Sequence, residues 1–95
     1  MNTNEIISIL QSVKPQLQHE YAVKKMGLFG SFTDGTYTDS SDVDILVEFE
    51  RPVGWNFFKL EKYLEKILNR KIDLVTVNAL NENIKHFVLS QIKDV

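Results

Sequence analysis

The segment from Asp42 to Phe49, DVDILVEF, constrains the fold of this chain more than any other stretch. Successive side chains of a β-strand point to opposite faces, so one face of this strand carries four apolar residues: Val43, Ile45, Val47 and Phe49. The opposite face receives Asp42 and Asp44. Two carboxylates this close repel one another unless a cation, a shared proton or solvent relieves them. The pattern therefore predicts a sheet with one apolar face and one face that carries paired acids.

The residues before this strand predict one helix and one strand. Apolar residues recur at helical spacing from Glu5 to about Gln18, and Pro15 either kinks that helix or opens a second short one. Tyr21 to Phe29 reads as a strand. Gly30 to Ser41 is rich in Gly, Ser, Thr and Asp, so we expect a loop with at most one helical turn after Gly30.

The residues after it predict a helix, a strand and a last helix. The segment from Trp55 to Asn69 has an amphipathic helical pattern, and Lys71 to Val77, KIDLVTV, reads as a strand. Asn81 is placed to cap a final helix with an apolar stripe of Ile84, Phe87, Val88 and Ile92. The order helix, strand, strand, helix, strand, helix predicts an α/β (α+β) fold, with helices flanking a short sheet.

Length and composition narrow the possible functions. A chain of 95 residues predicts a single domain, 1–95. The formal net charge of −2 gives no basic surface for a nucleic-acid backbone. The chain has no cysteine, which excludes disulfides, thiolate nucleophiles and zinc–thiolate sites. No charged-then-apolar leader or long apolar run is present, so we expect no membrane segment and a cytoplasmic location.

Three aspartates are candidates for metal chemistry. Asp42 and Asp44 share a strand face, and Asp73 joins them if the strands that carry them are neighbours. Carboxylates, waters and substrate phosphates are the ligands that Mg²⁺ prefers. Three aspartates from two strands would hold two metal ions, the arrangement used for in-line displacement at phosphorus. The alternative is that Asp42 caps a turn and the other two are solvated strand residues.

Gly30 and Ser31 form a candidate phosphate site. A glycine after a strand lets the backbone approach a phosphate, and a helical turn beginning at Ser31 would aim free N–H groups at it. A plain strand-ending turn is the alternative. Lys24 or Lys25 could reach the same phosphate or be solvated. The remaining polar and aromatic candidates are assigned to the surface or to a partner: His19, His86, Trp55 and Phe58.

Taken together, these motifs resemble the polymerase-β-like nucleotidyltransferase superfamily. The shared signature is Gly30-Ser31, an interval of ten residues, and Asp42-x-Asp44 in an apolar strand. The small size and the segments LFGSF, SDVDILVEF and KIDLVTV resemble its minimal branch, the MNT-domain, MntA-type antitoxins that pair with HEPN-domain toxins. The resemblance covers Val23 to Val77 most clearly.

The resemblance implies a palm-like mixed sheet and a set of roles. Gly30 and Ser31 would hold the triphosphate of ATP, while Asp42, Asp44 and Asp73 would bind the catalytic Mg²⁺ ions. Asp73 would help to hold the metal ion on the nucleophile side, or would accept the tyrosine proton. The implied reaction transfers AMP from Mg-ATP to a tyrosine of a HEPN ribonuclease toxin, which is thereby neutralised.

One departure from the family pattern leaves alternatives open. Many relatives carry a basic residue in the loop after Gly-Ser, whereas this chain has Asp34, which would disfavour phosphate. An antitoxin that acts by binding alone, and a small-molecule nucleotidyltransferase whose partner chain completes the acceptor site, are therefore kept as alternatives. Exposed Trp55 and Phe58 would serve either a toxin or a homodimer.

Overall fold

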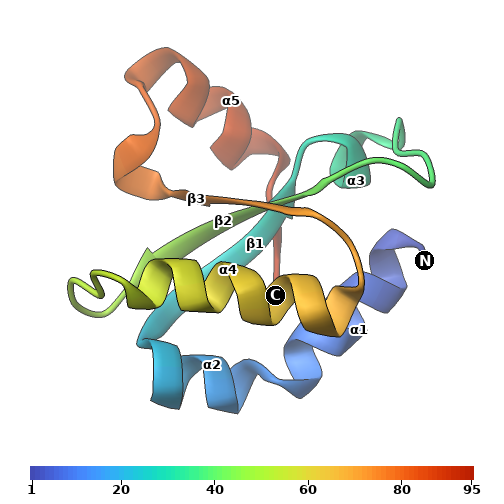
Figure 1. Ribbon diagram of the computed structural model, residues 1–95. Coiled ribbons are helices and arrows are strands. Elements are labelled where there is room, and N and C mark those ends of the chain that lie inside the picture. Colours follow the sequence, from blue (N-terminus) through green and yellow to red (C-terminus); the bar gives the residue numbers. More distant parts are fainter.

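The protein is built on a four-stranded mixed sheet with strand order β3-β2-β1-β4, in a computed structural model that describes residues 1–95 (Figure 1). The strands are β1 (Val23–Phe29), β2 (Val43–Phe49), β3 (Ile72–Thr76) and β4 (Lys93–Asp94). Strand β1 pairs antiparallel with β2 and β4, and β2 pairs parallel with β3. The predicted short mixed sheet is confirmed, but the sequence pattern gave no sign of β4.

Helices cover the two faces of this sheet unequally. One face is covered by α1 (Thr3–Ser12), α2 (Lys14–Tyr21) and α4 (Asn56–Leu68), which lie below the sheet in Figure 1. Of the four longer helices, only α5 (Glu82–Gln91) lies on the other side. Two short elements complete the chain: α3 (Ser31–Asp34) and the 3₁₀ turn η1 (Val77–Ala79).

The hydrophobic core lies between the sheet and the three-helix face. It is a single cluster of 15 buried residues, in which Leu28 and Ile45 of the sheet meet Leu60 and Leu64 of α4, all with no exposed surface. The alternation expected for β2 places Val43, Ile45 and Val47 in this cluster. The opposite face of β2 is thereby left for polar residues.

The first helical region is two helices, so the second of the two alternatives for Pro15 is right. Asn2 caps α1 by accepting a hydrogen bond from the Glu5 N–H at 2.9 Å, in a reciprocal capping box. Proline in the first turn of α2 has no N–H to lose there. Ala22 ends α2 in the left-handed region with φ 57°, so β1 begins two residues later than expected.

The last helix is correctly located, but its predicted apolar stripe is wrong. Asn81 accepts a hydrogen bond from the Ile84 N–H at 2.9 Å and caps α5 as expected. Val88 is buried, whereas Ile84 and Phe87 are 49% and 63% exposed. Ile92 lies past the end of the helix. The helix stands over one edge of the sheet without a second layer to pack against, so much of its apolar side remains in contact with solvent.

None of the helices has both the length and the apolar character that crossing a membrane requires.

Candidate active site

Gly30 and Asp44 are in direct contact at the end of β1. Phe29 is the register partner of Asp44, so the chain passes from the sheet into Gly30 beside that carboxylate. A Cβ atom on Gly30 would overlap Oδ2 of Asp44. Gly30 also has φ 72°, which side chains rarely adopt. Both constraints require glycine here, and they join the two sequence motifs into one site.

The helical turn α3 is anchored by Phe32, which is 2% exposed. Its ring stacks on Tyr37 with 4.5 Å between centroids, and its carbonyl accepts a hydrogen bond from Thr3 Oγ1 at 2.6 Å. The anchor fixes Ser31 as the first residue of α3, beside Gly30. The N–H groups of Thr33 and Asp34 donate to the Gly30 carbonyl at 3.0 and 3.2 Å. The N–H groups of Ser31 and Phe32, at the start of the turn, have no partner within it and are free to bind an anion.

Asp44 and Asp73 are brought together by the parallel pairing of β2 and β3, in which they are register partners. Burial raises the pKa of Asp44 to about 6, and the negative charge of Asp73, a hydrogen bond with it and the charge of Asp42 add to the effect. The pairing of β2 with β3 confirms that the strands carrying these aspartates are neighbours. Asp44 is half-buried, while Asp42 and Asp73 are exposed.

The acids suit Mg²⁺ in chemistry but do not form a ready-made metal cage. Carboxylate oxygens are the ligands Mg²⁺ prefers, and the pKa of Asp44 is raised first by burial and then by neighbouring negative charge, which a cation would relieve. No group of three or more acidic or histidine side chains is close enough to hold an ion as the side chains stand. Asp44 with Asp73 forms the compact pair, and Asp42 contributes to it by charge.

Asp34, the residue that departs from the family pattern, is occupied elsewhere. Its carboxylate accepts hydrogen bonds from the backbone N–H and the hydroxyl of Thr36, at 3.0 and 2.6 Å. These bonds lower the pKa of Asp34, and its side chain is exposed. Asp34 is not among the groups that shift the pKa of Asp44. Solvent therefore screens the charge of Asp34, and its hydrogen bonds with Thr36 hold the carboxylate within its own turn.

Arg70 is a residue that the sequence patterns did not single out. Its guanidinium donates a hydrogen bond to the Ser41 carbonyl at 2.9 Å and lies 5.3 Å from the centre of the Phe32 ring. It thus holds the loop immediately before Asp42 against α3. An arginine directly after a helix gives no recognisable signal, because its partners are backbone atoms about thirty residues away along the chain.

The other predicted candidates lie at the protein surface. Lys24, Lys25, His19 and His86 are exposed, as the surface interpretation expected. Trp55 and Phe58 are 81% and 54% exposed, with ring centroids 5.6 Å apart. Trp55 is the N-cap of α4 and Phe58 lies in its first turn, so neither belongs to the strands that carry the acids.

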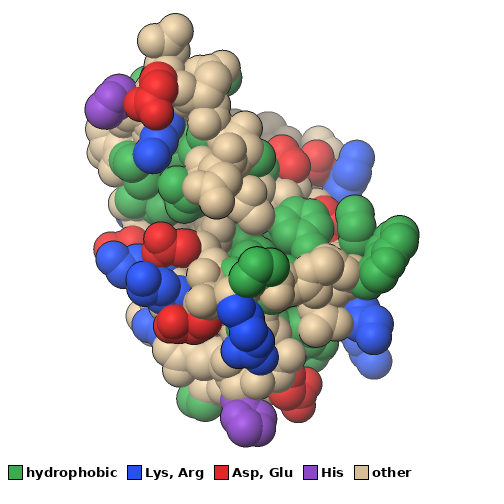
Figure 2. Space-filling view, turned by 90° about the vertical axis from the view of Figure 1, so that its left-hand side faces the viewer, with side chains coloured by type: hydrophobic (Ala, Val, Ile, Leu, Met, Phe, Trp, Pro, Cys, Tyr) green, Lys and Arg blue, Asp and Glu red, His purple; other side chains and the backbone are tan.

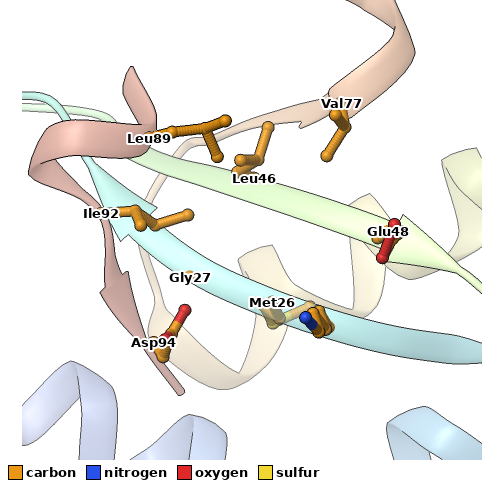
Figure 3. Close-up of a pocket in the computed structure, with 9 residues that line it drawn as sticks. Met26, Gly27, Leu46, Glu48, Val77, Leu89, Ile92 and Asp94 are labelled. Atoms are coloured by element: carbon orange, nitrogen blue, oxygen red, sulfur yellow. The ribbon is translucent and has the colours of Figure 1, made fainter. Parts of the chain in front are cut away.

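A groove adjoins the acids on the open face of the sheet (Figure 3). Its volume is about 300 Å³, and it begins at Leu46, which shares a strand face with Asp44. Asp42, Asp44 and Asp73 do not line it. Its walls come from β1, β2, η1 and the C-terminal segment: Lys25, Met26, Gly27, Leu46, Glu48, Val77, Leu89, Ile92 and Asp94.

Sequence comparison places this geometry in a family. Residues 9–95 match the family model described as a nucleotidyltransferase domain. A protein of Thermococcus cleftensis named protein adenylyltransferase MntA is 40% identical over 97% of this chain and 94% of its own length. A Methanocaldococcus jannaschii protein that also carries a protein adenylyltransferase name is 47% identical over 81% of this chain and 91% of its own.

Solved structures share this fold. A minimal nucleotidyltransferase has a TM-score of 0.85 at 24% identity and covers 100% of this chain and 97% of its own. A toxin–antitoxin complex with AMP-PNP has a TM-score of 0.69 at 27% identity and covers 99% and 72%. An MNT antitoxin with a tri-AMPylated HEPN toxin of Shewanella oneidensis has a TM-score of 0.60 at 24% identity and covers 98% and 67%. The chain belongs to the nucleotidyltransferase domain family and is an MntA-type nucleotidyltransferase.

Proposed function

We propose that this protein is an antitoxin that transfers AMP from Mg-ATP to a tyrosine of a HEPN-domain ribonuclease toxin and thereby neutralises it. The observation that carries the proposal is the convergence of Gly30, Asp44 and Asp73, three residues from separate segments, at one point of the sheet. The relatives named protein adenylyltransferase MntA, and the related toxin–antitoxin complex with AMP-PNP, support the reaction and the substrate.

In the proposed site, Gly30 and the first N–H groups of α3 hold the β- and γ-phosphates of ATP. Asp42, Asp44 and Asp73 would hold two Mg²⁺ ions, whose positive charge would offset the charge that develops on the phosphates. At pH 7 the Asp44 carboxyl is mostly ionised, because its pKa is about 6. This leaves its oxygens available as ligands in the cytoplasm, where we place the protein.

The transfer step forms one bond and breaks one. The tyrosine oxygen attacks the α-phosphorus, the bond from that phosphorus to the bridging oxygen of the β-phosphate breaks, and pyrophosphate leaves with the bonding electrons. The phenol loses its proton as the new bond forms. We assign this proton to Asp73, which is exposed and is the register partner of Asp44.

The test is a transfer assay with the product of the neighbouring gene as the HEPN partner. Wild-type protein, Mg²⁺ and ATP labelled at the α-phosphate are expected to label the partner. Asp44→Asn should abolish labelling, because it removes a negative charge from the acid pair. Asp39→Asn is the matched control, since Asp39 is an exposed acid of the same loop. A tight complex without any label would overturn the enzymatic reading in favour of an antitoxin that acts by binding.

A further inference from the structure

The groove beside the acids is formed by the last residues of the chain lying across the sheet. Figure 3 shows Leu89 of α5 facing Leu46 and Val77, with Ile92 over Gly27. A Cβ atom on Gly27 would lie 2.5 Å from Cγ1 of Ile92, so only glycine at this position lets the C-terminal segment approach so closely. The segment then pairs with β1 through β4. The apolar wall of the groove is therefore a fixed part of the fold.

The groove and Gly30 lie on opposite sides of Asp44. Along β1, the order is Gly27 in the groove, Phe29 beside Asp44, and then Gly30. Along β2, Leu46 follows Asp44 on the same strand face and enters the groove. A ligand that spans Gly30 and Asp44 consequently points its far end toward the groove.

In-line displacement makes this arrangement significant. The attacking oxygen must approach the α-phosphorus from the side opposite the leaving pyrophosphate. If pyrophosphate is held at Gly30 and Ser31, then the nucleophile arrives from the direction of Leu46. We propose that the groove is the acceptor site, and that it binds the apolar body of the residue that receives AMP together with its chain neighbours in a partner protein. This placement rests on the function proposed above.

The surroundings of the groove favour a protein segment over a small polar acceptor. Five of its nine lining residues are hydrophobic. Leu89, in the groove wall, is 45% exposed, and α5 continues outward with the exposed Ile84 and Phe87. Figure 2 shows hydrophobic side chains at the surface in the upper part of the molecule, the part that α5 forms in Figure 1. An apolar surface that extends beyond a groove suits a polypeptide that crosses it.

The kinetic test is Leu89→Glu, with Ser90→Glu as the control that adds the same charge to the next, exposed residue of α5. With labelled Mg-ATP and the HEPN partner, Leu89→Glu should lower kcat/KM for the partner at least about tenfold, because a charge now faces the apolar side of the acceptor. The KM for ATP should stay within about twofold of wild type, as the phosphates bind elsewhere. Ser90→Glu should match wild type. An unchanged partner kcat/KM, or an equal loss of ATP affinity, would overturn the acceptor assignment.

A crosslinking test separates failure of the groove from failure of the enzymatic function. The chain has no cysteine, so Leu89→Cys can be labelled uniquely with a benzophenone maleimide. Photolysis of its complex with the HEPN partner should join position 89 to the partner, whether or not AMP is transferred. A stable complex that gives no crosslink from position 89 would disprove the groove assignment. Absence of transfer by wild-type protein that still crosslinks would count against the enzymatic function alone.

Discussion

The two faces of the sheet differ in what they bury. The face covered by α1, α2 and α4 is apolar and closed to solvent, and it packs into the core cluster of 15 buried residues. The opposite face carries Asp42, Asp44 and the groove under α5, and it remains open to solvent over the acids. Strand β2 belongs to both faces, because its alternate side chains point in opposite directions. The comparison shows that one strand supplies stability on one side and chemistry on the other, so neighbouring residues should have opposite mutational effects.

The largest expected effect is the loss of activity in Asp44→Asn. Removing this negative charge should lower AMP transfer by about 10³-fold or more, the scale seen when one electrostatic contact is removed from an active site. The unfolding free energy at pH 7 should be unchanged or higher, because a half-buried charge that repels Asp73 has been removed. Transfer assays and urea denaturation check the two expectations. A large loss of stability would show that Asp44 serves the fold.

Its neighbour Ile45 should behave in the opposite way. Ile45 has no exposed surface in the core, so Ile45→Ala should lower the unfolding free energy by about 2–5 kcal/mol. If that variant does not fold, Ile45→Val should cost about 1 kcal/mol. Transfer by the folded Ile45→Val protein should equal wild type. A reduced kcat in Ile45→Val, under conditions in which the variant is fully folded, would show that the core face also affects the chemistry on the open face.

Gly30→Ala should lower both the AMP-transfer activity, through Asp44, and the stability, through backbone strain. The added methyl group overlaps the Asp44 carboxylate, and displacement of a catalytic group by about 1 Å costs about 10²-fold in rate. Gly35→Ala is the matched control, because Gly35 has φ 82° but no atom within 4 Å of an added Cβ. Both variants should lose stability through backbone strain, and only Gly30→Ala should lose transfer. Equal transfer activity in the two variants would contradict the inference that a side chain on Gly30 displaces Asp44.

The smallest expected effect is on the pH dependence of stability. The pKa of Asp44 is about 6 in the folded protein and 3.8 in the reference state. The folded state therefore holds this proton more strongly, and its contribution to stability is present below pH 4 and is lost as the pH rises through 6. After discounting for solvent screening of a half-exposed group, the loss is about 1 kcal/mol. Subtracting the Asp44→Asn denaturation curve from wild type between pH 4 and 7 isolates it; a flat difference would contradict the raised pKa.

Much of the fold could be read from local patterns. The alternation of Val43 to Phe49 gave both faces of β2, and the cap at Asn81 located the start of α5. The resemblance carried by Gly30-Ser31 and Asp42-x-Asp44 indicated the family that the comparisons show. These features succeed because strand alternation, helix capping and motif spacing depend on residues close together in the sequence.

Other features depend on contacts that no local pattern records. Strand β4 is two residues long and exists because Gly27 leaves space for Ile92 and Lys93. The apolar stripe predicted for α5 is wrong because only three-dimensional packing decides which side of a helix finds a partner. Arg70 acts through backbone carbonyls of a distant loop.

The sequence by itself determined the acid pair on β2, the glycine at the end of β1 and the apolar face that must be buried, since each follows from side-chain direction and backbone freedom. Only the tertiary structure decided that Asp73 lies beside Asp44, that Asp34 turns to Thr36 and away from the acids, and that a groove opens on the far side of Asp44 from Gly30. The reason is that strand register, loop hydrogen bonding and the path of the C-terminal segment are set by contacts between residues far apart in the chain.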